Sequence, residues 1–378
     1  MNNSNKCNIL LIGKYPPMQG GVSSKSYWLF EKLKKHDFEF QIITSYVDRY
    51  ITLKNKEEKF VHYITSKEVP WHIPNSELLF DKLLNKSLEV IKDFIPDIIE
   101  TNYLWPYCGV ASYLSLHLKK PLLIRHAGSD ILKFYKNKDF SVTIKSYFDQ
   151  AEYIITNNTS QKIIQKLCSN KSKVKLMDRY IPDPESFFSR KIKKKYDILF
   201  AGKINYFWNL KGIEYLLKYI KTDSLKALFL IDGKYVEDIY SIINKEKLNS
   251  NIDFSTFIHP CEMPEIINQC KSVWCWEEIN YIQDFSNLIS ESLFCKVSCF
   301  INYHEDIKEE FDRLFKFFPE LIIPIDPLKT KSIKHLISEA DYEKSHLSRI
   351  EQKRMYNDFI NQNIELYHSF LRQKNETF

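Results

Sequence analysis

Glycine is scarce in this sequence, with eight residues in a chain of 378, about 2% where roughly 7% is usual. A chain this poor in glycine keeps it mainly where a Cβ is not tolerated, in left-handed turns or where the backbone approaches a ligand. The eight glycines are Gly13, Gly20, Gly21, Gly109, Gly128, Gly202, Gly212 and Gly233. Most of them follow a short apolar run or begin a helix-like segment. Ligands bind at such strand ends in parallel sheets, so the glycines mark a candidate site.

Several other features are missing, and each absence excludes a class of protein. No apolar run approaches the 18 or so residues of a membrane span. The first residues lead to no small-residue cleavage site, so we expect no signal peptide and a cytoplasmic protein. The eight cysteines contain no Cys-x-x-Cys pair and no zinc-like spacing with histidine, so we expect reduced and mostly buried thiols.

The charge is only mildly unbalanced, with 54 Lys and Arg against 48 Asp and Glu, a formal excess of +6. This excess permits an anionic partner but does not demand one. The sequence has neither a dense basic face nor a known nucleic-acid module, so we expect no nucleic-acid partner.

The start of the chain is repeated near its middle. Segments 8–14 and 197–203 share Ile-Leu and Gly-Lys at the same positions, and Gly13 and Gly202 are 202 − 13 = 189 residues apart. Each copy continues through a polar loop into an amphipathic stretch, which predicts two α/β domains in tandem. The proline and charge content of 179–195 is typical of a linker. We therefore expect domains at 1–184 and 185–354, with a final helix at 355–378 packing back towards the N-terminal domain.

Two segments have less certain roles. Residues 46–75 are polar, aromatic and lysine-rich, and we interpret them as a surface insertion. The first helix contains Lys25, Lys32, Lys34 and Lys35 with Trp28. Two interpretations stay open for it: peripheral contact with an anionic membrane, or an ordinary helix with its lysines in water.

Six segments in a defined order carry a family resemblance. They are Lys14-Tyr-Pro-Pro with Gly20-Gly21-Val22, Tyr103-Leu-Trp-Pro-Tyr107, Arg125-His-Ala-Gly-Ser-Asp130, Ala201-Gly-Lys203 with Lys211-Gly212, Asp232-Gly233, and Gln283-Asp-Phe-Ser-Asn-Leu-Ile-Ser-Glu291. With this order and spacing the sequence resembles the nucleotide-sugar glycosyltransferases of the GT-B fold, in particular the retaining enzymes of glycosyltransferase family 4. The resemblance implies two Rossmann-like domains that face each other across an interdomain cleft.

The resemblance assigns the donor's diphosphate to Lys203 and Lys211, with Gly202 in the same turn. Two fixed cations would stabilise the charge that a leaving nucleoside diphosphate gains. No Asp-x-Asp occurs in the sequence, so we expect no divalent metal in that role and no cofactor. Backbone N–H groups near Asn287 and Leu288, at a helix start, would hold phosphate oxygens.

Further roles follow from the same resemblance. Glu291 corresponds to the family's second glutamate, which accepts hydrogen bonds from the nucleotide ribose. Gly20 and Gly21 would let the backbone approach the phosphate and the acceptor, and His126 would contact the transferred sugar. Retaining enzymes of this fold favour front-face attack, in which the leaving phosphate oxygen takes the acceptor's proton and no protein nucleophile is needed.

The sequence also departs from the family pattern. The family's first glutamate is Gln283 here, which can hydrogen-bond a sugar hydroxyl but carries no charge; Asp284, Glu277 and Glu278 are the neighbouring candidates for its role. Lys203 replaces the usual arginine, which keeps the charge but loses the bidentate geometry. Each candidate also has a structural alternative: Lys203 and Lys211 as ordinary solvated lysines, His126 as a packed or surface histidine, and Glu291 as a plain helix surface carboxylate.

These observations predict a retaining glycosyltransferase that moves a hexosyl-type sugar from a nucleotide-sugar donor to a glycan or lipid-linked acceptor in cell-envelope polysaccharide assembly. One alternative is a nucleotide-sugar epimerase on the same fold, which changes the donor without adding an acceptor. A second alternative is a degenerate homologue that binds a nucleotide or a partner protein, for which Gln283 is the motivating departure.

Overall fold

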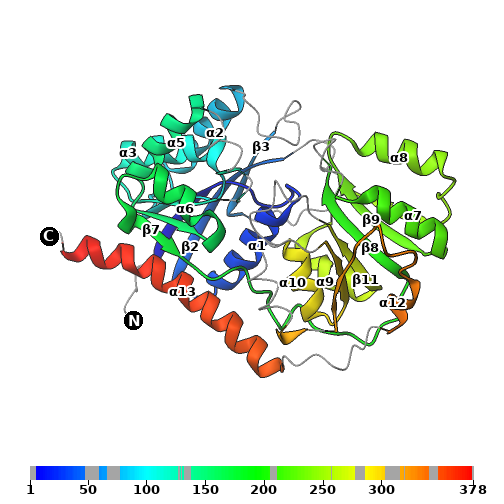
Figure 1. Cartoon of the computed structure of the whole chain (residues 1–378). Coiled ribbons are helices and arrows are strands. Elements are labelled where there is room, and N and C mark those ends of the chain that lie inside the picture. Colours follow the sequence, from blue (N-terminus) through cyan, green and yellow to red (C-terminus); the bar gives the residue numbers. More distant parts are fainter. Residues whose placement is uncertain are drawn as a thin grey trace. The chain divides into compact units, whose positions relative to one another are not determined.

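The computed structural model describes residues 6–46, 59–65, 77–126, 128, 130–131, 138–204, 211–256, 258–276, 286–302, 316–318, 320–339 and 348–376. Its contacts divide the chain into two compact units (Figure 1). The first unit comprises 1–18, 22–180 and 357–378, and the second comprises 19–21 and 181–356.

The first unit contains a seven-stranded sheet in the order β3-β2-β1-β4-β5-β6-β7. All its strand pairs are parallel. The strands are β1 Cys7–Ile12, β2 Phe38–Tyr46, β3 Val61–Thr65, β4 Ile98–Thr101, β5 Leu122–Arg125, β6 Tyr153–Thr156 and β7 Val174–Leu176. The helices are α1 Gly21–Leu33, α2 Glu77–Val90, η2 Leu104–Cys108, α3 Gly109–Leu118, α5 Lys138–Gln150, α6 Asn158–Leu167, η3 Lys171–Lys173 and α13 Arg349–Glu376.

Helices cover the first sheet because its strands are apolar on both sides. Leu10, Ile12 and Ile99 share one core with Leu83 of α2 and Leu114 of α3. Strands buried on both faces are typical of parallel sheets, in which the crossover helices form the outer layers. The sequence repeat at 8–14 thus begins a strand in the middle of this sheet.

The second unit contains a six-stranded sheet in the order β10-β9-β8-β11-β12-β13, again with parallel pairs. Its strands are β8 Tyr196–Lys203, β9 Ala227–Asp232, β10 Ile252–Ser255, β11 Cys270–Cys275, β12 Ser298–Ile301 and β13 Ile322–Pro324. Its helices are α7 Ile213–Asp223, α8 Val236–Lys245, η4 Pro260–Glu262, α9 Met263–Asn268, α10 Asn287–Phe294 and α12 Lys334–Glu339. Two parallel α/β sheets are what the repeat predicts.

Two parts of the chain differ from the sequence interpretation. Within 46–75, which we interpreted as a surface insertion, β3 pairs with β2 and extends the sheet. The strand β13 was not predicted, and it forms the edge of the second sheet beside β12. Both strands are short, and strand pairing rather than local pattern brings them into the sheet.

Helix α1 buries its aromatic side. Tyr27, Trp28 and Phe30 are all buried, and the Tyr27 and Trp28 rings lie 5.2 Å apart. Lys34 forms an ion pair with Glu31, and its Nζ lies 4.1 Å from the Phe60 ring centroid. Trp28 therefore packs in the core and is not part of an exposed face with the lysines.

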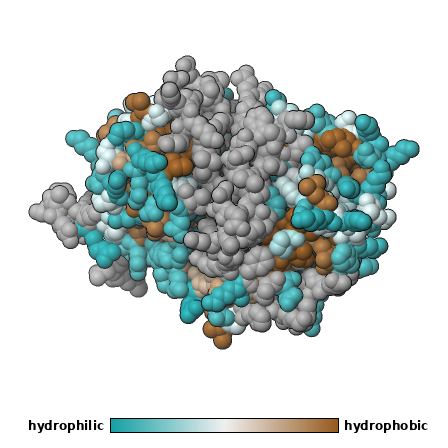
Figure 2. All heavy atoms as spheres, in the orientation of Figure 1, coloured by the Kyte–Doolittle hydropathy of each residue, from teal (hydrophilic) through white to brown (hydrophobic). Residues whose placement is uncertain are grey.

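On the face shown in Figure 2 hydrophilic residues predominate, and the hydrophobic ones form separate patches. Among the described residues, no helix is long and apolar enough to cross a membrane. All eight cysteines are described and none forms a disulfide; only Cys261 is exposed, which confirms the expectation of mostly buried thiols.

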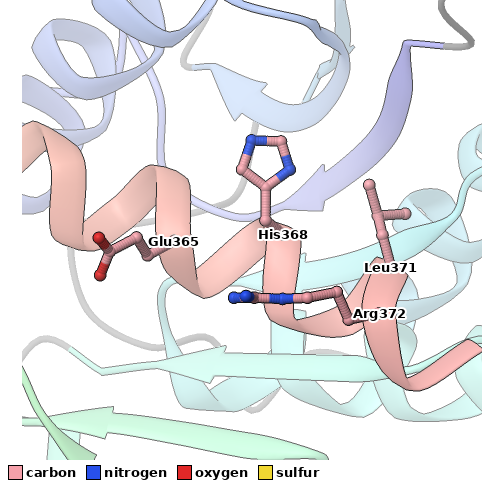
Figure 3. A pocket seen from close by; sticks show the side chains of 4 residues that line it. All are labelled: Glu365, His368, Leu371 and Arg372. Carbon is pink, nitrogen blue, oxygen red and sulfur yellow. The ribbon is translucent and has the colours of Figure 1, made fainter. Parts of the chain in front are cut away.

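Helix α13 belongs to the first unit from Asn357 onward and is amphipathic there. It buries Phe359, Tyr367 and Phe370. Its other side carries a hollow of about 380 Å³. Glu365, His368, Leu371 and Arg372 line it, and the charged groups of Glu365 and Arg372 point to the same side of the helix (Figure 3). The lining residues in the described part of the chain all come from this one helix.

Candidate active site

The candidate site residues lie at the carboxyl ends of central strands. In the first sheet the strand order changes direction between β1 and β4, and in the second between β8 and β11. Open α/β sheets bind ligands in the crevice outside the strand ends at such a switch point. Gly13 follows β1 and Gly202 lies near the end of β8, so both copies of the repeat end at this position.

In the first unit, the loop after β1 is held by a residue that the sequence analysis did not select. The Asn102 Oδ1 accepts from the Lys14 N–H at 2.8 Å, and its Nδ2 donates to the Lys14 carbonyl at 2.8 Å. The same Nδ2 lies 2.7 Å from Ser26 Oγ on α1. A Cβ at Gly13 would overlap the Asn102 amide, so the glycine leaves room for it. The only sequence signal for Asn102 is its place directly after a strand.

The Lys14 side chain extends over an aromatic ring. Its Nζ lies 3.3 Å from the centroid of Tyr103, which also follows β4. A cation above a ring face is attracted by the ring quadrupole. Tyr107 on the same loop lies 3.0 Å from Ser45 of β2. The segment after β4 is therefore tied both to the loop after β1 and to the strand β2.

His126 lies directly after β5 and both of its ring nitrogens have partners. The Gly128 N–H donates to Nδ1 at 3.0 Å, so Nδ1 is unprotonated and Nε2 carries the proton. Nε2 then donates to Thr156 Oγ1 at 3.1 Å. Burial, with a smaller contribution from the Lys25 charge, lowers the pKa of His126 from 6.5 to about 3. The ring is neutral at pH 7, and one tautomer is fixed.

In the second unit, the two predicted phosphate lysines flank one glycine. Lys203 is the last residue of β8, and Gly202 precedes it. A Cβ at Gly202 would lie 2.9 Å from Lys211 Cδ and 3.3 Å from its Cε, so the Lys211 stem passes directly over Gly202. The structure thus places the Lys211 stem beside the end of β8, over the glycine that precedes Lys203.

The backbone at Lys211 is unusual and is supported by tryptophans. Lys211 has a φ of 55° and Gly212 a φ of 62°, so two left-handed residues in a row lead into α7. The Trp274 indole N–H donates to the Lys211 carbonyl at 3.0 Å, and its ring stacks on Trp276 with centroids 5.5 Å apart. A Cβ at Gly212 would lie 2.6 Å from Trp276 Cγ. Trp274 is buried, and this pair fixes the turn that carries Lys211.

Helix α10 presents its N-terminus in the same unit. It begins at Asn287, and Ser286 before it makes no side-chain capping hydrogen bond. The first N–H groups of a helix lack intrahelical partners and favour an anion. Leu288 and Glu291 are buried, and the Glu291 charge adds to burial in raising the pKa of Cys295 to about 12. Gln283 and its neighbours Glu277, Glu278 and Asp284 lie outside the described residues.

Gly20 and Gly21, the other candidate glycines, lie at the entry to α1. Gly20 has a φ of 128°, a conformation that favours glycine, and Gly21 begins α1. No group of three His, Cys, Asp or Glu side chains that could hold a metal occurs in the described part of the chain.

A family model described as Glycosyl transferase 4-like matches residues 24–158. This segment, about a third of the chain, is therefore similar to glycosyl transferase 4-like domains. It includes α1, Asn102 and His126, and it ends before Lys203, Lys211 and α10. No curated protein sequence matches the chain.

Several solved structures are similar in fold to this chain over almost its whole length. Sucrose-phosphate synthase from Thermosynechococcus elongatus is similar with a TM-score of 0.68 at 14% identity, covering 97% of this chain and 100% of that one. HepE from Anabaena in complex with UDP and glucose has a TM-score of 0.66 at 15% identity, covering 96% of this chain and 99% of that one. UDP-N-acetylglucosamine 2-epimerase from Rickettsia bellii has a TM-score of 0.65 at 13% identity, covering 98% of this chain and 99% of that one. The expected GT-B fold is confirmed.

Proposed function

We propose that the protein is a retaining glycosyltransferase that moves a sugar from a uridine diphosphate donor to a glycan or lipid-linked acceptor, in cell-surface polysaccharide assembly. The observation that carries this proposal is the pair Lys203 and Lys211 on either side of Gly202. Both lysines lie at the carboxyl end of β8, beside the point where the strand order changes direction. Similar structures named as complexes with UDP and UDP-glucose support uridine diphosphate.

In this proposal the two lysines bind the diphosphate. As the bond between sugar and phosphate breaks, negative charge accumulates on the leaving oxygen, and fixed cations stabilise that charge more than the ground state. The lysines would supply this stabilisation without a divalent metal. The Asn287 and Leu288 N–H groups at the start of α10 would bind further phosphate oxygens, and Glu291 would accept from the ribose.

The acceptor's hydroxyl would attack on the face from which the diphosphate leaves, and its proton would pass to the leaving phosphate oxygen. Neutral His126 suits a sugar contact, because a buried cation near the anomeric carbon would oppose the positive charge that develops there.

The second candidate is an epimerase, since UDP-N-acetylglucosamine 2-epimerase has a similar fold. An epimerase would convert the nucleotide-sugar with no acceptor.

A thermal-shift panel with UDP, GDP, ADP, CMP and dTDP, with magnesium or with EDTA, tests the donor site. A ligand at 100 times its dissociation constant stabilises the folded protein by about 2.7 kcal/mol. We expect UDP to raise the melting temperature equally with and without magnesium. Lys211→Ala should remove most of the shift, whereas Lys218→Ala, which changes an exposed lysine of α7, should retain it. If no nucleotide shifts the wild type, the degenerate-homologue alternative takes precedence.

NMR of the slow hydrolysis products of UDP-glucose, UDP-galactose and UDP-N-acetylglucosamine tests the chemistry. A retaining transferase should release the α-anomer first and form UDP. Release of the β-anomer first would contradict retention. Conversion to another nucleotide-sugar, with no free sugar formed, would identify the epimerase instead.

A further inference from the structure

Three buried polar side chains connect the C-terminal helix to the first sheet. The Arg125 Nε donates to Glu100 Oε1 at 2.8 Å. The Tyr367 hydroxyl donates to the other carboxylate oxygen, Oε2, at 2.6 Å. Arg125 Nη2 also lies 3.5 Å from the Tyr367 hydroxyl. The exposed fractions are 9% for Arg125, 1% for Glu100 and 0% for Tyr367, so water does not compete for these contacts.

The geometry divides the Glu100 carboxylate between two partners. Glu100 of β4 is paired with Leu123 of β5, and Arg125 lies two residues further on the same side of the sheet. Burial and the Glu100 charge together raise the pKa of Tyr367 well above 10, so the phenol keeps its proton and acts as the donor. Burial opposes the positive charge of Arg125, but the Glu100 carboxylate outweighs it and raises the pKa of Arg125.

Glu100, Arg125 and Tyr367 form a triad, and two of its members lie close in the sequence to candidate site residues of the first unit. Arg125 is the last residue of β5, and His126 follows it. Asn102 lies two residues after Glu100. A change in the side-chain orientation of Arg125 or Glu100 therefore acts on the backbone that also carries His126 and Asn102. Tyr367 is the member of the triad that comes from a distant part of the sequence.

We propose that Tyr367 is a positioning residue, whose hydroxyl fixes the Glu100–Arg125 pair and through it the His126 turn. The catalytic consequence rests on the proposed function, because it requires His126 to contact the sugar. The effect on the position of the His126 ring does not rest on the proposed function. The triad would then keep the His126 ring in the tautomer with the proton on Nε2, bound to Thr156.

The competing explanation is that Tyr367 only anchors α13 through packing. Its ring lies 5.3 Å from that of Phe38, so packing and hydrogen bonding are separable. Tyr367→Phe removes the hydroxyl and keeps the ring. Phe38→Leu weakens the packing on the same ring and leaves the hydroxyl in place.

The ring-nitrogen chemical shifts of His126, measured by NMR on protein with ¹⁵N-labelled histidine, decide between these explanations. His126→Gln identifies the signals. We expect Tyr367→Phe to move the His126 signals and Phe38→Leu to leave them unchanged, although both variants lower the melting temperature. Arg125→Lys, which removes the Nε donor but keeps the charge, should move the same signals and provides a second route if Tyr367→Phe is poorly folded.

Unchanged His126 signals in Tyr367→Phe and Arg125→Lys would overturn the proposal, as would equal movement in Phe38→Leu. With a turnover assay, we expect Tyr367→Phe to lower kcat about tenfold with the donor KM changed less than twofold, as for an interaction made mainly in the transition state. Equal kcat in wild type and Tyr367→Phe would contradict the catalytic consequence. Absence of turnover in the wild type would count against the proposed function alone, since the NMR comparison needs no activity.

Discussion

The side-chain amide of Asn102 forms two hydrogen bonds with the backbone of Lys14, both 2.8 Å long. The loop after β1 is thus fixed by a residue that follows β4, the neighbouring strand in the sheet. Gly13 makes this possible, because any larger residue there would meet the amide. Two neighbouring strand ends share one hydrogen-bonded unit, which also includes Ser26 of α1.

This arrangement predicts strong coupling between Gly13 and Asn102. Gly13→Ala should cost about 1–3 kcal/mol of unfolding free energy, because the added methyl group must displace the amide. Asn102→Ala should cost a similar amount, about 1–3 kcal/mol, because it removes two hydrogen bonds to the partly buried Lys14 backbone. The double variant should cost clearly less than the sum, since the methyl group then occupies the vacated space. Urea unfolding of the four proteins measures the cycle, and additive costs would contradict the contact.

The positions of the glycines could be predicted from the sequence because each one reports a local requirement. Gly202 follows an apolar strand and lies under the Lys211 stem, and Gly233 with a φ of 129° follows β9. Such residues identify strand ends without knowledge of the rest of the fold. The repeat between 8–14 and 197–203 likewise indicated two sheets, because it combines an apolar run, a glycine and a following helix.

The contacts between distant segments could not be predicted in this way. Asn102 and Lys14 are 88 residues apart, and Tyr367 and Glu100 are 267 apart, so no local pattern connects them. The strand β3 was missed because its surroundings are polar and only its pairing with β2 makes it a strand. The functional roles of Lys203, Lys211 and Glu291 stay predictions, since their partners in a reaction are substrates.

The buried ion pair predicts a large stability effect at Glu100. Glu100→Gln should lower the unfolding free energy by about 3–5 kcal/mol, because Arg125 would keep a buried charge without its counterion. Glu89→Gln is the matched control: Glu89 also pairs with a cation, Lys86 at 2.6 Å, but it is exposed, so this variant should scarcely change the stability. Urea unfolding measures both variants.

Replacing both partners by apolar residues gives a further check of the same pair. The double variant Glu100→Leu with Arg125→Met should be less destabilised than Glu100→Gln, since it leaves no uncompensated charge. If Glu100→Gln costs no more than Glu89→Gln, the carboxylate of Glu100 does not balance Arg125 in solution.

His126 predicts a specific dependence of stability on pH. Its pKa is about 3 in the folded protein against 6.5 ordinarily. Above about pH 6.5 both states hold a neutral ring, and its full contribution is present. As the pH falls from 6.5 towards 3, the unfolded chain binds a proton that the folded protein does not. The unfolding free energy should therefore decrease by up to about 1.4 kcal/mol for each pH unit.

Urea unfolding at several pH values between about 7.5 and 5 measures this slope. His126→Gln should flatten it, because the residue no longer titrates. His117→Gln, which changes an exposed histidine on α3, should keep the slope of the wild type. Equal slopes in the wild type and His126→Gln would show that the ring of His126 is protonated as readily in the folded protein as in the unfolded chain.

The contact between Gly202 and Lys211 predicts a variant that separates binding from stability. A Cβ at residue 202 would lie 2.9 Å from Lys211 Cδ, close enough to displace this side chain. The obstacle is part of a flexible stem, so Gly202→Ala should change the melting temperature little. The Lys211 ammonium group should nevertheless move away from Lys203, and under the proposed function the affinity for UDP should fall about tenfold, about 1.4 kcal/mol.

Isothermal titration calorimetry with UDP measures this loss, and the thermal unfolding of the free protein measures the stability. Gly212→Ala serves as the contrast, because its Cβ would lie 2.6 Å from Trp276 Cγ and 2.7 Å from Cδ2, within a rigid ring that cannot bend aside. That variant should lose stability as well as affinity. Gly202→Ala with undiminished UDP binding would mean that the ammonium group of Lys211 does not contact the diphosphate, and Lys203 with the start of α10 would then have to hold it.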